Sequence, residues 1–278
     1  MDTMTRTTPP IALTIAGSDS SGGAGIQADL KTFTALGVYG ATVITALTAQ
    51  NTLGVTSVHQ VPADFIAAQF EAVTSDLMVA AVKTGMLGDV ETVMTVAGLL
   101  SRLKPPFLVA DPVMVATSGD RLLDANAISA VREELIPLAS LITPNIPEAA
   151  ALLEEAPAVA ELDMERQARQ LLKLGCGAVL IKGGHGEGSE AADILVTADG
   201  VRWFRRPRID TRNTHGTGCT LAAAITAGLA QGLELDAAID QAKAFVWAAL
   251  KSGADQKIGR GNSPVDHLFN VRKPASEG

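Results

Sequence analysis

The sequence contains few of the residues that stabilise secreted domains or bind structural zinc. Two cysteines, Cys176 and Cys219, cannot build a framework of several disulfides, and so low a number fits a reducing compartment. Four scattered histidines and two distant cysteines also lack the spacing of a zinc site. We therefore expect a fold that depends on neither disulfides nor zinc.

Long apolar runs and an excess of positive charge are missing as well. No uninterrupted apolar run approaches the length of a membrane span, and residues 1–10 (MDTMTRTTPP) lack the apolar region of a signal peptide. The formal net charge of −8 at pH 7 gives no electrostatic reason to bind nucleic acid or an anionic membrane. We expect a cytoplasmic protein with neither of these partners.

Two common nucleotide-binding motifs are also absent. The string G-x-x-x-x-G-K-[ST] does not occur, which excludes a Walker-type phosphate loop, and no G-x-G-x-x-G follows a predicted strand. A phosphate-bearing ligand would therefore have to be held locally, by backbone amides and single cations.

The sequence does contain a regular alternation of short β-branched runs and longer helical segments. Strands are predicted at 11–16, 41–47, 56–61, 81–87, 107–114, 141–143 and 178–184, and helices at 25–36, 63–73, 89–103, from 147, 161–174, 217–231 and 236–252. This alternation predicts an α/β fold with a mostly parallel central sheet and helices on both faces. The turn Asp199-Gly200 between two β-rich runs predicts an antiparallel edge hairpin near 193–209.

The chain shows no proline- or serine-rich linker and no shift in composition along its length. Apolar residues make up 47% of it. We therefore predict one domain over residues 11–270, with flexible tails at 1–10 and 271–278.

In open α/β sheets, ligands bind beyond the carboxyl ends of the strands. The loop GSDSSGGAG follows the first predicted strand and leads into a helix that carries Asp29, and Gln50 follows the next strand. Both residues also have plain interpretations, since a glutamine fits a polar loop and an aspartate fits a helix surface. His185 and His215 are lone histidines that we interpret as loop residues or as hydrogen-bonded neighbours of a site.

Polar residues also follow the later strands. Asp111 lies in ADPVM, Lys182 in IKGGHG, and Asn145 and Glu148 in TPNIPEA. Asn145 three residues before Glu148 matches a capping box at a helix start. Asp111 before a proline is also typical of a strand end, and Lys182 in a glycine-rich turn is also typical of a solvated side chain. Single residues therefore leave these roles open.

The segment THGTGC carries a more specific pattern, because it opens a helix of small apolar residues. Gly216 and Gly218 can direct free amides at one point, where the helix dipole adds a partial positive charge of roughly half a unit. Cys219 falls in the first turn, where the same field is expected to lower the pKa of a thiol. A small buried apolar residue is the other interpretation of Cys219.

Together these parts are the ones that phosphoryl transfer requires. Lys182 supplies a cation, Gly216 and Gly218 an anion hole, and Cys219 a general base. Mg²⁺ with ATP as phosphoryl donor is the implied cofactor, and the region of Asp111, Asn145 and Glu148 is its predicted site.

The chain closely resembles the hydroxymethylpyrimidine/phosphomethylpyrimidine kinases of thiamine biosynthesis, which belong to the ribokinase-like superfamily. The resemblance spans roughly residues 11–268. It rests on seven ordered blocks: AGSDSSGGAGIQADLKTFTALGVYG, VITALTAQNT, VKTGMLGD, DPVMVATSGDRLL, TPNIPEA, VLIKGGH and NTHGTGCTLAAAI.

The resemblance implies a single ribokinase-like domain that phosphorylates 4-amino-5-hydroxymethyl-2-methylpyrimidine and then its monophosphate. It implies that Gln50 binds the aminopyrimidine in a pocket lined by Asp29, Met86 and Val113. It further implies that Lys182 and Thr211 lie beside the nucleotide and that Asn145 and Glu148 organise Mg²⁺ near Asp111. Gly216 and Gly218 would form the anion hole, with Cys219 as the base. The resemblance also implies a homodimer.

Two other functions stay open at this point. A pyridoxal kinase would use the same scaffold, since both substrates are six-membered nitrogen heterocycles with a hydroxymethyl group. A ligand-binding sensor that had lost turnover is a second alternative, which the presence of Lys182, Glu148 and Cys219 disfavours.

Overall fold

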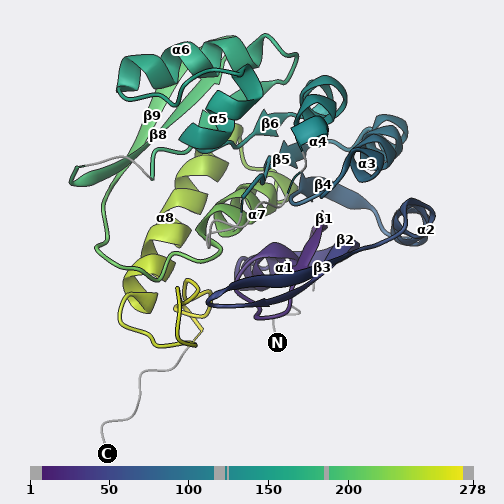
Figure 1. The fold of residues 1–278 in the computed structure, drawn as a ribbon, viewed down its shortest axis with the longest axis horizontal. Coiled ribbons are helices and arrows are strands. Elements are labelled where there is room, and N and C mark those ends of the chain that lie inside the picture. Colours follow the sequence, from purple (N-terminus) through teal and green to yellow (C-terminus); the bar gives the residue numbers. More distant parts are fainter. Residues whose placement is uncertain (1–7, 116–122, 124, 185–187, 272–278) are drawn as a thin grey trace, which may run out of the picture.

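The protein, described as a computed structural model over residues 8–115, 123, 125–184 and 188–271, is built around a nine-stranded sheet (Figure 1). The predicted tails therefore lie largely outside the described residues. The strands are β1 Ile11–Asp19, β2 Tyr39–Asn51, β3 Gly54–Gln60, β4 Val79–Thr84, β5 Leu108–Ala110, β6 Leu141–Ile142, β7 Ala178–Ile181, β8 Glu190–Thr197 and β9 Gly200–Pro207.

The strand order is β3-β2-β1-β4-β5-β6-β7-β8-β9. All pairings from β2 to β7 are parallel, and β8 is antiparallel to both β7 and β9, which confirms the predicted edge hairpin. β3 forms a second antiparallel edge beside β2, which the sequence pattern did not predict. The turn at residues 52–53 is too short for a parallel crossover, so β3 must fold back on β2.

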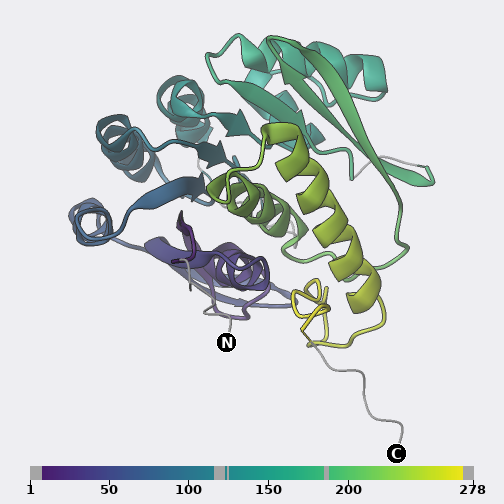
Figure 2. The same ribbon diagram turned by 180° about the vertical axis from the view of Figure 1, so that it is seen from behind.

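Helices cover both faces of the sheet, as predicted. The helices α1 Gly25–Ala35, α7 Thr217–Ala230 and α8 Leu235–Gly253 lie on one face. The other face carries α2 Ala63–Thr74, α3 Val90–Leu103, α4 Ala125–Ala130, α5 Ile146–Leu153 and α6 Glu161–Leu172 (Figures 1 and 2). The short helix α4, which continues into a π-helical turn at Val131–Leu135, was not predicted.

Alternation along each strand divides the core between these two faces. In β1, Leu13 and Ile15 pack with the α2–α3 side, whereas Ala12 packs beside Phe33 of α1 and Ala223 of α7. Successive side chains of a strand point to opposite faces, so a strand covered on both sides is apolar throughout.

Helix α7 is the most deeply buried helix of the three on its face. Every residue from Thr220 to Leu229 is buried, so the helix has no polar side to expose. Its alanines and glycines allow close packing against the sheet below and α8 above. The small residues after THGTGC therefore place this helix, and its N-terminus, at the centre of the molecule.

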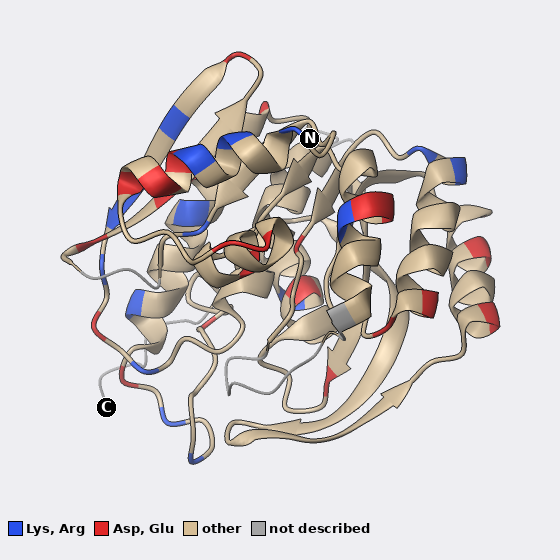
Figure 3. Ribbon diagram, turned by 45° about the horizontal axis from the view of Figure 1, so that its top comes forward, with Lys and Arg blue, Asp and Glu red and all other residues tan. Residues whose placement is uncertain are grey.

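Charged residues of both signs are interspersed over the outer helices and the β8–β9 hairpin (Figure 3). Several form exposed ion pairs, such as Arg205 with Glu161 and Arg202 with Asp236. Such pairs contribute about 0–1 kcal/mol each, so they shape solubility more than stability. In the part of the chain that the structure describes, no helix is long and apolar enough to cross a membrane.

Candidate active site

The strand order reverses between β1 and β4, and such switch points are where open α/β sheets bind ligands. A cavity of about 830 Å³ lies there, at the carboxyl ends of the strands and in front of α7. The structure brings ten of the predicted residues into its walls: Gln50, Met86, Asp111, Val113, Asn145, Glu148, Lys182, Gly216, Gly218 and Cys219.

Two predicted residues do not line this cavity. Asp29 has 0% exposure, and both its carboxylate oxygens accept hydrogen bonds from Lys83, at 2.9 and 2.8 Å. Lys83 lies in the cavity wall in its place, so the expectation that Asp29 lines the pocket is wrong. The Thr211 hydroxyl donates to the Ala254 carbonyl at 3.0 Å, and Thr211 is not among the lining residues, so its place beside the nucleotide stays a prediction.

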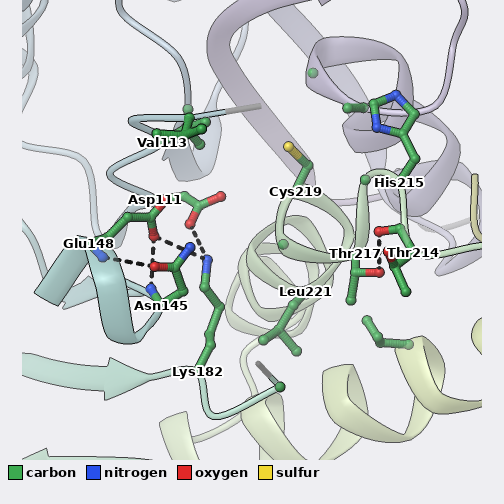
Figure 4. Close-up of a pocket in the computed structure, with 18 of the residues that line it drawn as sticks. Asp111, Val113, Asn145, Glu148, Lys182, Thr214, His215, Thr217, Cys219 and Leu221 are labelled. Carbon is green, nitrogen blue, oxygen red and sulfur yellow. Dashed lines mark hydrogen bonds and ion pairs between the residues drawn. The ribbon is translucent and has the colours of Figure 1, made fainter. Parts of the chain in front are cut away.

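Lys182, Asp111 and Glu148 form one charged cluster (Figure 4). The Lys182 ammonium projects from the end of β7 to within 2.8 Å of Asp111 Oδ1 and 3.9 Å of Glu148 Oε2. Burial acts to lower the pKa of Lys182, but the two carboxylates outweigh it and raise that pKa above its usual value. The side chain is therefore a fixed cation in the cavity, which excludes the interpretation of Lys182 as a solvated residue.

The first turn of α5 forms a capping box and also contributes Glu148 to this cluster. Glu148 donates its backbone N–H to Asn145 Oδ1, and Glu148 Oε2 accepts from the Asn145 N–H, both at 2.8 Å. The capping interpretation is thus confirmed, and it presents Glu148 to the cavity in a fixed position. Burial raises the pKa of Glu148 to about 7, against the attraction of Lys182, so this carboxyl is poised between its two forms near neutral pH.

Opposite this cluster lies the N-terminus of α7. Gly216 occupies its N-cap position with φ 79°, so the first amides of the helix face the cavity. A Cβ built on Gly218 would lie 3.3 Å from Lys182 Nζ, which places the glycine backbone directly against that ammonium. Helix amides and an ammonium at one point form a binding place for a small anion such as phosphate.

Cys219 lies in the first turn of α7 and lines the cavity (Figure 4). Burial raises the pKa of its thiol to about 11; Lys83 acts in the opposite sense, while Asp29 and Asp111 add to the rise. The prediction of a lowered pKa is therefore wrong, because loss of hydration and two nearby carboxylates outweigh Lys83 and the backbone hydrogen bond from Gly25. The thiol is nevertheless in the predicted place.

Asp19 and His215 organise the loop after β1, and the sequence pattern missed Asp19. Its carboxylate accepts from the amides of Ser21, Gly23 and Ala24 and contacts His215 Nε2 at 2.9 Å. Burial acts to raise the pKa of Asp19, but these hydrogen bonds lower it to about 2. His215 is thus a hydrogen-bonded neighbour, as predicted, whereas His185 lies outside the described residues. A carboxylate in a glycine-rich loop was the available signal for Asp19.

The Gln50 side chain reaches the cavity through an irregularity in its strand. The register between β2 and β3 shifts between Ala49 and Gln50, and such a bulge re-aims a side chain. Ser20 fixes the Gln50 backbone, donating to its carbonyl at 2.7 Å and accepting from its N–H at 2.9 Å. These two hydrogen bonds join the first loop to the β2–β3 hairpin in one wall of the cavity.

Residues 19–266 match the family model described as phosphomethylpyrimidine kinase. The chain belongs to this family. A relative named hydroxymethylpyrimidine/phosphomethylpyrimidine kinase, from Rhizobium meliloti (strain 1021), is 55% identical over 258 residues, which cover 93% of this chain and 97% of that one.

Solved structures of kinases agree with this fold. A pyridoxal kinase of Bacillus subtilis, solved as an ADP complex, superposes with a TM-score of 0.88 at 38% identity and covers 95% of this chain and 100% of that chain. A phosphomethylpyrimidine kinase of Clostridium difficile 630 has a TM-score of 0.78 at 45% identity and covers 87% of this chain and 99% of that one. The protein is a ribokinase-like kinase, as predicted.

The donor set of the kinase fits Mg²⁺. Asp111 Oδ2 is buried and has no hydrogen-bond partner among the described residues, so it is the oxygen that a cation would complete. No group of three or more His, Cys, Asp or Glu side chains with the arrangement of a metal site occurs in the described ranges. Mg²⁺ on ATP needs no such group, because it takes one or two carboxylates together with phosphate oxygens and water.

Replacing Gly216 by alanine is expected to destabilise the kinase and to lower its activity. A Cβ at this position would lie 1.8 Å from the Gly23 carbonyl oxygen, and its φ of 79° is unfavourable for any other residue. We expect the free energy of unfolding in urea to fall by about 2 kcal/mol or more. Gly232→Ala is the matched control, since Gly232 has φ 85° and nothing near its Cβ position. An equal loss in both variants would show that the contact with Gly23 is unimportant.

Proposed function

We propose that the kinase transfers the terminal phosphoryl group of ATP to the hydroxymethyl oxygen of 4-amino-5-hydroxymethyl-2-methylpyrimidine, and then to the resulting monophosphate, in thiamine biosynthesis. The observation that carries this proposal is a single cavity in which the N-terminus of α7 and Lys182 separate two chemically different ends. The family membership and the 55% identity to the Rhizobium relative support the choice of substrate.

One end of the cavity suits a small polar ring. It is lined by Gln50, near the end of β2, and by Met86 and Val113, which follow β4 and β5. The Gln50 amide offers a donor and an acceptor, which matches a ring nitrogen beside an exocyclic amine. Met86 and Val113 provide apolar surface for the two faces of a ring.

The other end suits a nucleotide base. It lies toward β9 and α8 and is lined by the apolar side chains of Leu221, Ile209, Val246 and Leu250. ATP bound along this axis would place its phosphates between the Gly216–Gly218 amides and Lys182, and its base against α8. Mg²⁺ held by Asp111 and Glu148, with Asn145 fixing Glu148, would supply positive charge to the phosphate oxygens.

In the proposed transfer, the acceptor oxygen forms a bond to the terminal phosphorus while the bond to the bridging oxygen breaks, and ADP leaves. Lys182 and the amides of Gly216 and Gly218 stabilise the charge on the transferred group. The hydroxyl proton passes to the Cys219 thiolate, with Lys83 as the cation that favours this form of the thiol.

Turnover of Mg-ATP with four acceptors in parallel tests the proposal: the hydroxymethylpyrimidine, its monophosphate, pyridoxal and ribose. We expect ADP formation with both pyrimidines and a diphosphate product by mass. Phosphorylation of pyridoxal alone would move the activity to vitamin B6, a second candidate that the fold of the Bacillus subtilis pyridoxal kinase favours. No turnover from folded protein would refute the kinase mechanism.

Replacing Gln50 by leucine is expected to lower kcat/KM for the hydroxymethylpyrimidine by about 10²-fold or more, because buried polar groups of the ring lose their partner. KM for ATP should stay near the wild-type value, since Gln50 lies at the other end of the cavity. Gln231→Leu, at the exposed C-terminus of α7, is the control. An unaltered kcat/KM in Gln50→Leu would show that another residue recognises the ring.

The homodimer that the family resemblance implies and the cytoplasmic location expected from the sequence both belong to this proposal. A cytoplasmic enzyme has ATP available and keeps Cys219 reduced. Sedimentation equilibrium of the purified chain tests the dimer: a single species of monomer mass across concentrations would contradict it.

A further inference from the structure

A buried ion pair that the proposed chemistry does not use lies at the α8 end of the cavity. Lys243 Nζ of α8 is 2.5 Å from Asp193 Oδ2 of β8, and each side chain is only 7% exposed. Both residues line the cavity, on the side of the apolar surface assigned above to the nucleotide base.

Such a pair is seldom kept for stability alone. Removing two charges from water is costly, and apolar residues of similar volume often replace a buried pair without loss of stability. The pair Arg202–Asp236 joins the same hairpin to the same helix at the surface, with side chains 55% and 48% exposed. A tether between hairpin and α8 therefore does not require a buried charge.

The second carboxylate oxygen of Asp193 connects the ion pair to the glycine turn after Lys182. Asp193 Oδ1 accepts a hydrogen bond from the Gly183 N–H at 2.9 Å. Gly183 leaves no room to move toward β8, because a Cβ there would lie 1.9 Å from the Ala192 carbonyl oxygen. From the other side, Arg208 donates to the Gly184 carbonyl at 2.6 Å. The two-glycine turn after Lys182 is thus held on both sides.

Lys182 itself is positioned by other contacts. Its N–H donates to the Pro144 carbonyl at 2.9 Å, and its ammonium pairs with Asp111. Loss of the Asp193–Lys243 pair would therefore displace the backbone of Gly183 and Gly184 while leaving the Lys182 ammonium in place.

We propose that the Asp193–Lys243 pair positions the Gly183–Gly184 backbone as a wall of the nucleotide site, so that both residues act on ATP binding rather than on the chemical step. This inference rests on the proposed function in one respect, the placement of the nucleotide at this end of the cavity. Asp193 and Lys243 are positioning residues in this proposal and make no contact with the reacting atoms.

Two double variants separate this role from a structural one. Asp193→Leu/Lys243→Met removes the Gly183 contact and both charges, whereas Asp193→Asn/Lys243→Met removes the charges and keeps an oxygen for the Gly183 N–H. We expect the first to raise the Kd for ADP and the KM for ATP by about 10-fold or more, as displaced binding groups do. The KM for the pyrimidine and the kcat at saturating ATP should stay near wild type. The asparagine variant should lose ADP affinity by a smaller factor, since it keeps an acceptor for the Gly183 N–H but lacks the Lys243 contact that fixes the side chain of residue 193.

The exposed pair supplies the control, since Arg202→Met/Asp236→Leu should change neither constant. If the leucine variant does not fold, Asp193→Ala/Lys243→Met removes the same contact without added bulk. Wild-type binding of ADP in the variants that lack the Gly183 contact would overturn the proposal. Equal losses in the asparagine and leucine variants would also overturn it, by assigning the effect to the Lys243 charge. Calorimetric binding of ADP needs no turnover, so this result is independent of whether the pyrimidine is the substrate.

Discussion

Replacing Lys182 by methionine is expected to lower kcat by about 10³-fold, since one cation that faces the transferred phosphoryl group is lost. The side chain lies among Asp111, Glu148 and the Gly218 backbone, where the phosphates are proposed to bind. KM for the pyrimidine should change little. The measurement is steady-state turnover with ATP and pyrimidine varied separately.

The same change also removes the counter-charge of two buried carboxylates. The pKa of Glu148, about 7 in the intact cluster, should rise further without Lys182, and we expect a lower thermal midpoint. Lys173→Met, at the exposed C-cap of α6, is the control for a lost lysine charge. Activity of Lys182→Met near that of Lys173→Met would contradict the assignment of Lys182 to the phosphates.

Replacing Cys219 by serine is expected to lower kcat by about 10² to 10³-fold while ADP still binds as in the wild type. A serine hydroxyl is a far weaker acid than a thiol, so it cannot supply the anionic base. Because the pKa of the thiol is about 11, the thiolate is the minor form at neutral pH. If it is the base, wild-type kcat should rise by up to about tenfold per pH unit between pH 7 and 9, and Cys219→Ser should lose this rise.

The second cysteine provides the control for this experiment. Cys176 is buried beside β7, its Sγ lies 3.8 Å from the Leu171 carbonyl oxygen, and it is absent from the cavity walls. Cys176→Ser should therefore cost stability and leave kcat and its pH dependence intact. A wild-type rate in Cys219→Ser would exclude the thiol as base.

Most of the fold was predictable from local patterns. The alternation of β-branched and helical segments requires parallel strands with crossover helices, and Asp199-Gly200 places the β8–β9 turn. The β3 edge was missed because a strand's sequence does not state the direction of its neighbour. Only the short turn at residues 52–53 decides it, through the geometry of the connection.

Most residues of the site were predictable from the sequence, whereas their charge partners and pKa values were less so. Residues at the carboxyl ends of parallel strands meet at one edge of the sheet, which brings Asp111, Asn145 and Lys182 together. Asp29 was misplaced because a helix residue shows in sequence neither its burial nor its partner, Lys83, which lies 54 positions further along the chain. Lys83 itself was missed because a lysine inside an apolar strand has no distinct pattern.

The sequence by itself determined which groups are available: two glycines and a thiol at a helix start, a lysine after a strand, and a capping box that contains a glutamate. These choices are local, because caps, turns and helix termini depend on neighbouring residues. Only the tertiary structure decided the protonation of those groups. The pKa of Cys219 rises rather than falls because burial removes the water that would otherwise stabilise the thiolate, and because Asp29 and Asp111, which are distant in the sequence, lie near it in space.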